Sequence, residues 1–335
     1  MAKIKDVARH ANVSVSTVSY VLSGKRPISQ ETRERVYESI RILGYQPHAG
    51  ARALASKRTN VVALMMPLHS GVYVPVVMQF VTAVVTRARE VDHDVLVLTK
   101  DEGEDGLHRV QERSLADALI VMDVEMHDVR LPFLRTLHTP AVLIGFPEES
   151  GGLTCVDLDF AAAGAACVDH LADLGHTCVG LVGSPYVVYQ RETGFATRVA
   201  SGIRMAARRR GISTSTHPCD PTPDGVRQAV SDLLGQHPGM TGLIVHNEAV
   251  IETLLAALRE RGRRVPEDIS VVAIGPKDLA RRFDLTAVEL PAQEIGRRAV
   301  DLAMAQLEEA SVPAATLLAP RMTVRGSTIS RNGRG

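Results

Sequence analysis

Several signatures that would assign a chemistry are missing from this 335-residue chain. It has four cysteines and no Cys-x-x-Cys pair, which argues against a zinc ribbon or a small disulfide framework. No stretch approaches eighteen consecutive apolar residues and the N-terminus is charged, so we expect neither a membrane helix nor a signal peptide. Gly-rich dinucleotide loops, phosphate loops and a His-Glu-x-x-His motif are missing as well. The absences favour a cytoplasmic protein without cofactor or metal, and they weaken any enzyme hypothesis.

The charge is zero overall but unevenly distributed. Residues 1–60 contain eleven Lys and Arg against four Asp and Glu, a net charge of +7. The rest of the chain contains 27 basic and 34 acidic residues, a net charge of −7. A basic head on an acidic body is typical of a polyanion-binding module joined to a second unit. An ordinary solvated surface is the alternative.

Three short stretches of the head carry apolar residues at helical spacing. They are Val7, Ala8 and Ala11, then Val18, Val21 and Leu22, then Val36, Ile40 and Leu43. Asn12 tolerates the left-handed backbone of a tight turn between the first two helices. Ser14 and Ser29 are placed to cap the second and third helices, and Gly44 to end the third. The pattern predicts a helix-turn-helix.

In such a motif the N-terminal residues of the second helix face the major groove of DNA. Here they are Val15, Ser16 and, one turn later, Tyr20. An outward Val15 suits a thymine methyl group, and Ser16 suits a hydrogen bond to a base edge. Phosphate contacts are expected from flanking polar side chains, namely Lys5, Thr17, Ser23, Lys25 and Tyr45. For any one of these, solvated surface is an equally good interpretation.

The head resembles the LacI/GalR family of transcriptional regulators in three runs: IKDVARHANVSVSTVS from Ile4, VLSGKRPIS up to Ser29, and LGYQP up to Pro47. The resemblance implies that the Ala-rich segment after Pro47 becomes a hinge helix only on the operator. Two such helices would lie in the minor groove, with Leu54 inserted between base pairs and Ala51 beside it. A helix this short is marginal in water, and an inserted Leu bends the duplex. The alternative for Leu54 is a linker residue packed on the body.

The expected domains are a DNA-binding domain at 1–47, a hinge helix at 48–59 and an effector-binding and dimerisation domain at 60–330. The expected DNA-contacting residues are Lys5, Ser14, Val15, Ser16, Thr17, Tyr20, Lys25, Arg26, Tyr45, Ala51 and Leu54.

Beyond residue 60, apolar strand-like runs alternate with amphipathic helical stretches, which predicts parallel sheets with helices on both faces. The runs are 61–66, 95–99, 118–122, 141–145, 178–183, 242–246 and 270–275. The resemblance implies a bilobed, periplasmic-binding-protein-like α/β domain with two doubly wound parallel sheets. We expect crossovers between its lobes near Asp157–Asp159, Leu285–Leu290 and Ala319–Met322.

Ligands of open sheets bind beyond the carboxyl ends of strands. Residues there include His69, Asp123 and Phe146, and Tyr73 follows shortly after the first run. The resemblance places Arg191 and Asn247 where the family holds a sugar or another polar effector; a guanidinium and an amide suit hydroxyls or a carboxylate. For Arg191 the alternative is a surface position. His69, Tyr73 and Phe146 would stack on or hydrogen-bond to the effector, or simply pack.

Two positions depart from the family pattern. Gly275-Pro276 stands where relatives usually have an aspartate pair, so the hydroxyl-gripping carboxylate is not carried over. Glu248 replaces the usual Asp after Asn247.

The favoured function is a repressor of carbohydrate-related genes that binds a palindromic operator as a homodimer and is released by a sugar-like inducer. A dimer is favoured because the C-terminus lacks leucine heptads. The alternatives are a corepressor-dependent regulator that responds to a non-sugar metabolite, and an enzyme of sugar or nucleotide metabolism that uses Asp157 and Asp159. A transport binding protein fits the body but not the head.

Overall fold

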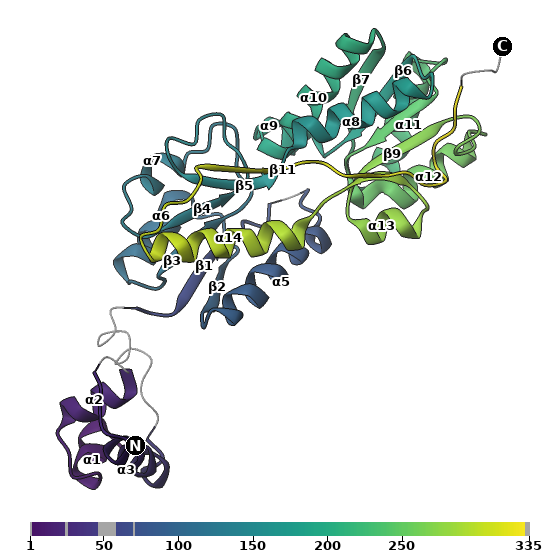
Figure 1. Cartoon of the computed structure of the whole chain (residues 1–335). Coiled ribbons are helices and arrows are strands. Elements are labelled where there is room, and N and C mark those ends of the chain that lie inside the picture. Colours follow the sequence, from purple (N-terminus) through teal and green to yellow (C-terminus); the bar gives the residue numbers. More distant parts are fainter. Residues whose placement is uncertain (1, 24–25, 46–57, 70, 332–335) are drawn as a thin grey trace.

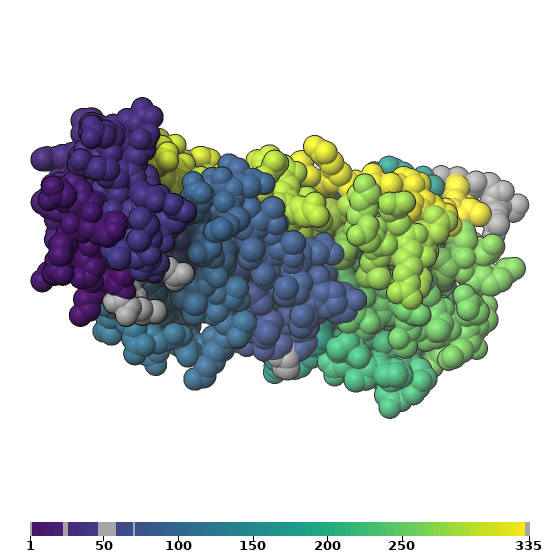
Figure 2. All heavy atoms as spheres, turned by 90° about the horizontal axis from the view of Figure 1, so that it is seen from below, coloured from purple at the N-terminus to yellow at the C-terminus, as the bar shows by residue number. Residues whose placement is uncertain are grey.

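The computed structural model describes residues 2–23, 26–45, 58–69 and 71–331, which form a three-helix head and a two-lobed body (Figure 1). Figure 2 shows the head in purple, the N-terminal lobe mainly in blue and the C-terminal lobe mainly in green, one after another along the molecule. The expected fold class, an all-α head on a bilobed α/β body, is confirmed.

The head consists of α1 (Ile4–His10), α2 (Val15–Ser23) and α3 (Gln30–Leu43). Its core is built from the apolar stripes that the sequence predicts, and Val7, Val18 and Val36 have no exposed surface. Burial of these three stripes against one another stabilises helices that would be too short to persist alone.

Local signals set the ends of these helices as expected. Asn12 adopts a φ of 53° in the turn between α1 and α2. The Ser14 hydroxyl accepts a hydrogen bond from the Thr17 backbone N–H at 3.0 Å, and Ser29 caps α3 in the same way. Gly44, with a φ of 56°, ends α3 in the left-handed conformation that glycine adopts without strain.

The N-terminal lobe is built on a sheet with strand order β11-β5-β4-β3-β1-β2, in which every neighbouring pair is parallel. Its strands are β1 (Val61–Met65), β2 (Asp94–Leu98), β3 (Ala118–Val121), β4 (Ala141–Ile144), β5 (Thr154–Leu158) and β11 (Ala315–Leu318). The helices that cover it are α5 (Val74–Glu90), α6 (Gly103–Glu112), α7 (Leu131–Leu134) and α14 (Ala292–Leu307). Strands β3, β4 and β5 are buried throughout, as expected for a sheet covered on both faces.

The C-terminal lobe repeats this design with strand order β12-β10-β9-β8-β6-β7. Its strands are β6 (Cys178–Gly183), β7 (Ser213–Pro218), β8 (Gly242–Val245), β9 (Ser270–Gly275), β10 (Thr286–Glu289) and β12 (Met322–Thr323). Its helices are α8 (Phe160–Asp173), α9 (Tyr186–Gln190), α10 (Gly194–Arg210), α11 (Pro223–Gln236), the short η1 (Glu248–Val250), α12 (Ile251–Glu260) and α13 (Lys277–Arg282). The expectation of fully parallel sheets is wrong at one edge, where β12 runs antiparallel to β10.

The chain passes between the lobes three times, after β5, after β10 and between β11 and β12 (Figure 1). These passages lie at the three predicted crossovers. Because the carboxyl ends of both parallel sheets meet at the crossovers, the fold creates a ligand-sized space between the lobes.

Candidate functional site

The start of α2 presents an exposed polar and apolar face. Val15 is 41% exposed and Ser16 is exposed as well, whereas Val18 and Val21 of the same helix are buried in the head. The Ser14 hydroxyl lies 2.8 Å from the hydroxyls of both Ser16 and Thr17, so the cap also orients these side chains. No acidic residue lies in the first turn of α2, which leaves the positive end of its dipole free to face an anion.

Basic and aromatic groups flank this face. The Arg26 guanidinium carbon lies 5.0 Å from the centre of the Tyr20 ring, and Arg26 is exposed while Tyr20 is half-buried. Lys5 on α1 is exposed. This part of the head therefore offers both cations for phosphates and hydroxyl and methyl groups for base edges.

Tyr45 differs from the expectation. Its side chain is only 7% exposed and packs in the head core, so it has little surface for a phosphate. Lys25, Ala51 and Leu54 lie outside the described residues, as does most of the expected hinge helix.

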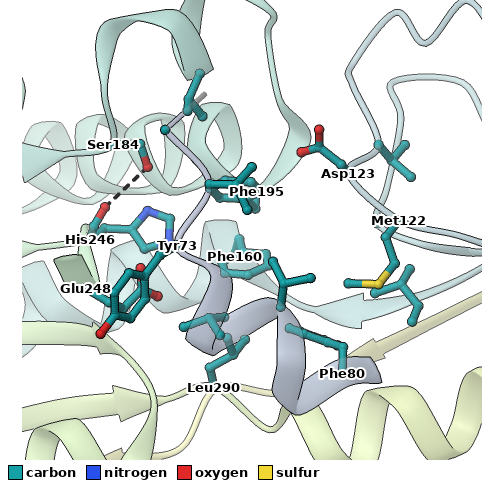
Figure 3. Close-up of a pocket in the computed structure, with 18 of the residues that line it drawn as sticks. Tyr73, Phe80, Met122, Asp123, Phe160, Ser184, Phe195, His246, Glu248 and Leu290 are labelled. Atoms are coloured by element: carbon teal, nitrogen blue, oxygen red, sulfur yellow. Dashed lines mark hydrogen bonds between the residues drawn. The ribbon is translucent and has the colours of Figure 1, made fainter. Parts of the chain in front are cut away.

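A pocket of about 160 Å³ lies between the two lobes (Figure 3). Four of the six predicted effector residues line it: Tyr73, Asp123, Arg191 and Asn247. They follow β1, β3, β6 and β8, at the edge of each sheet where ligands were expected, and Arg191 stands at the C-terminal end of the short helix α9.

An ion pair joins the lobes at one end of the pocket. Arg191 of the C-terminal lobe contacts Asp123 of the N-terminal lobe at 2.7 Å, and Glu125 lies 3.7 Å away. His69 does not line the pocket, but its Nε2 lies 3.3 Å from the same Asp123 carboxylate. Beside this pair the backbones meet directly, since the Met126 N–H donates to Glu192 O and the Gly194 N–H to Val124 O, both at 2.9 Å.

The prediction for Phe146 is wrong. Ile144 and Gly145 line the pocket, whereas Phe146 packs on the core of the N-terminal lobe. Gly145 forms a bend with a φ of 138° directly after β4, so the chain changes direction before Phe146. Only its carbonyl takes part in the lobe contact, accepting a hydrogen bond from Arg198 at 3.2 Å.

Asn247 is buried with its amide already engaged. Its nitrogen donates to Gly183 O at 3.0 Å and to Cys219 O at 2.8 Å. Both amide hydrogens are therefore used within the protein, and the side-chain oxygen is the part that remains for a ligand. Ser184 is similarly engaged, as its hydroxyl donates to His246 O at 3.4 Å (Figure 3).

Three rings that the sequence did not point to form one wall. The Phe160 and Phe195 ring centres lie 6.0 Å apart, and the His246 ring stands edge-on to Phe195 at 5.6 Å. Burial lowers the pKa of His246 to about 4, so this ring is neutral at neutral pH. Together with Phe80 and Met122 they make the pocket predominantly apolar (Figure 3).

Two further carboxyl groups line the pocket. Asp157 is 7% exposed and accepts a hydrogen bond from the Leu158 N–H at 2.9 Å. Glu248 fills the space beside Gly275, where an added Cβ would lie 3.0 Å from its Cγ. Because Gly275 has no side chain, the Glu248 side chain, which follows the neighbouring strand β8, can occupy this space. Burial raises the pKa of both Asp157 and Glu248 to about 7.

Within the described part of the chain, no group of three or more His, Cys, Asp or Glu side chains is arranged to hold a metal ion. Among the same residues, no helix combines the length and apolar character needed to cross a membrane.

Two family descriptions match the chain. Residues 3–48 match bacterial regulatory proteins of the lacI family, and residues 168–328 match the periplasmic binding protein-like domain. Catabolite control protein A of Priestia megaterium is 27% identical over 334 residues, covering 97% of this chain and 98% of that protein. The HTH-type transcriptional regulator GalS of Salmonella typhimurium is 29% identical and covers 91% of this chain and 89% of that protein.

Solved structures show the same fold over almost the whole chain. The lac repressor dimer bound to operator and the anti-inducer ONPF superposes with a TM-score of 0.83 at 22% identity, covering 98% of this chain and 99% of that chain. The complex of the regulator CelR with cellobiose gives a TM-score of 0.69 at 24% identity, covering 98% and 100%. Residues 3–48 are thus a helix-turn-helix domain of the lacI type, joined to a periplasmic-binding-protein-like body.

Proposed function

Because the chain joins a lacI-family DNA-binding domain to a periplasmic binding protein-like domain, we propose that it is a ligand-controlled, sequence-specific transcriptional regulator acting as a repressor. The relatives it matches are named as regulators and repressors, among them PurR of Klebsiella pneumoniae at 28% identity over 90% of this chain. A regulator works where the DNA is, so a cytoplasmic location follows from this proposal.

The exposed start of α2 is the observation that carries the proposal. Val15 is 41% exposed and lies beside the exposed Ser16, at the start of a helix whose first turn has no acidic residue. The Ser14 cap orients the neighbouring hydroxyls. A single exposed valine is common on protein surfaces, so it is the combination of these groups at a helix N-terminus that fits the reading of DNA. Direct reading of a base pair through such contacts contributes about 1–3 kcal/mol of discrimination for each good pair of contacts.

The test is selection of preferred sequences from a random DNA pool, followed by gel shifts at physiological salt. We expect a palindromic sequence bound far more tightly than random DNA. Val15→Asp should abolish this preference, while Tyr37→Ser serves as a matched control on α3, because Tyr37 is exposed on a face of the head that we do not assign to DNA. Equal affinity for selected and random DNA would reject the proposal.

A homodimer fits one exposed apolar face of the body. Val74, Met78 and Val85 are 47%, 45% and 42% exposed, and their spacing of four and seven residues places them on one side of α5. The other side of α5 packs against α14 (Figure 1). A two-fold interface that covers this face would supply the two heads that a palindrome requires.

Ligand in the pocket would alter the contacts between the lobes, and through the dimer it would alter the spacing of the heads. Ligand could release the operator (induction) or promote its binding (corepression), and we propose induction. A gel shift with and without ligand distinguishes the two, because an inducer lowers the affinity for the operator and a corepressor raises it. A carbohydrate effector stays a prediction from the sequence. The enzyme alternative finds no support in the names of the relatives.

A further inference from the structure

The pocket between the lobes holds more acidic than basic side chains. Its charged lining consists of Asp123, Asp157, Arg191 and Glu248. Asp123 pairs with Arg191 at 2.7 Å, so these two charges cancel. Among the described residues neither Asp157 nor Glu248 forms an ion pair, although both residues line the cavity. The pocket therefore has two carboxyl groups in excess.

Each of these carboxyl groups is held in an environment that resists its charge. Asp157 is more than nine-tenths buried, and the one hydrogen bond to its carboxyl group comes from the Leu158 N–H. Arg198 is the cation that acts on Asp157 from a distance, but its guanidinium donates to the carbonyls of Phe146 and Pro147. Burial likewise raises the pKa of Glu248. A ligand with a positive charge would supply the countercharge that these carboxyl groups lack.

The rest of the pocket wall favours a ligand with an apolar surface over one rich in hydroxyl groups. The side chains of Phe80, Met122, Phe160, Phe195 and Leu290 surround the space in Figure 3. A saccharide hydroxyl placed against them would lose its water without gaining a partner. The donors of Asn247 and Ser184 are already engaged within the protein. The polar groups that remain for a ligand, the Asn247 oxygen among them, are mainly acceptors, which suits a ligand that donates hydrogen bonds. Aromatic faces, by contrast, attract cations.

We propose that the effector is an organic cation, an ammonium group carried on an apolar, ring-sized body. The ammonium supplies the countercharge to Glu248, and the body packs on the Phe80, Phe160 and Phe195 side. The inference rests on the proposed function only in taking this pocket as the effector site. The effector proposed here is an amine and differs in chemical class from the carbohydrate that the sequence predicts.

Four probes test the charge and the body separately: 2-phenylethylamine, 2-phenylethanol, 3-phenylpropionate and cellobiose. Calorimetry and thermal shift on the full chain should show the amine bound at least about tenfold more tightly than the alcohol, as expected for a charge-assisted hydrogen bond. The anion and cellobiose should give no shift. Equal binding of amine and alcohol, binding of cellobiose without the amine, or no binding of any probe would overturn the proposal.

Glu248→Gln keeps the side-chain size and removes the negative charge. It should weaken amine binding at least about tenfold and leave alcohol binding unchanged. Glu252→Gln is the matched control, because Glu252 is exposed on α12 and pairs with Arg282 outside the pocket. Unchanged amine binding in Glu248→Gln would contradict the proposal. Operator binding by the protein without any probe is measured separately, so failure of the regulator function is distinguished from failure of the cation site.

Discussion

Replacement of Asp157 by Asn should remove a loss of folding stability that the protein suffers as the pH rises. Burial raises the pKa of Asp157 from its ordinary 3.8 to about 7 in the folded protein. The folded state therefore keeps this proton up to about pH 7, whereas the unfolded chain loses it near pH 4. Because the folded state binds more protons in this window, stability falls as the pH rises from about 4 to 7 and stays low above it.

The size of the effect follows from the same pKa change. At about 1.36 kcal/mol per pKa unit, a rise from 3.8 to about 7 corresponds to about 4 kcal/mol of lost stability above pH 7. Asn keeps an oxygen that can accept the hydrogen bond from the Leu158 N–H and carries no charge. The variant should match the wild type near pH 4 and exceed it at pH 8, with a melting temperature higher by roughly 5–10 °C.

Thermal unfolding at a series of pH values between 4 and 8 measures this directly. Glu252→Gln serves as the control, since exposed pairs contribute about 0–1 kcal/mol and its profile should parallel that of the wild type. An Asp157→Asn profile that also runs parallel to the wild type would show that this carboxyl group is not a buried acid with a raised pKa.

Three further substitutions test other parts of the molecule. Arg191→Ala removes the interlobe ion pair with Asp123, so ligand should no longer release the operator, while fluorescence anisotropy should show operator affinity changed by less than about twofold; a normal ligand response would count against this. Met78→Glu places a charge on the exposed side of α5 and should weaken the dimer at least about tenfold in sedimentation without unfolding it; an unchanged dimer would place the interface elsewhere. Ser14→Ala removes the cap of α2 and should destabilise the head by about 1 kcal/mol, seen as faster amide exchange at Thr17; unchanged exchange would contradict the capping role.

The head and the central strands were predictable because their signals are local. Apolar residues at helical spacing predict α1 to α3. The ends of these helices are predicted by residue types that are preferred at a turn, an N-cap and a C-cap, namely Asn12, Ser14 and Gly44. The buried strands β1, β3, β6 and β9 read as continuous apolar runs, which is what a parallel sheet covered on both faces requires.

Other elements give weak local signals. β7 is an edge strand of polar residues, STSTHP, and lacks the apolar alternation that predicts a strand. α14 packs on α5 through small residues: a Cβ added at Gly296 would lie 2.7 Å from the Ala83 Cβ. Such close approach needs Gly and Ala, which contribute little to a hydrophobic pattern.

The pocket shows the same division. Arg191, Asn247, Asp123 and Tyr73 were found from strand ends and from the family resemblance. The Phe160, Phe195 and His246 wall was missed because its rings come together only through the packing of the lobes. The position of Glu248 beside Gly275 was missed for the same reason, because it depends on two strand ends that are neighbours only in the folded sheet.

The most direct test of the central claim is the effect of Ser16→Ala on binding to the selected palindrome and to each of its single-base variants. If Ser16 contacts a base edge, the variant loses discrimination at one symmetrically placed base pair in each half-site and keeps it elsewhere. A loss spread evenly over all positions, or no loss at any, would contradict the claim that the start of α2 reads DNA sequence.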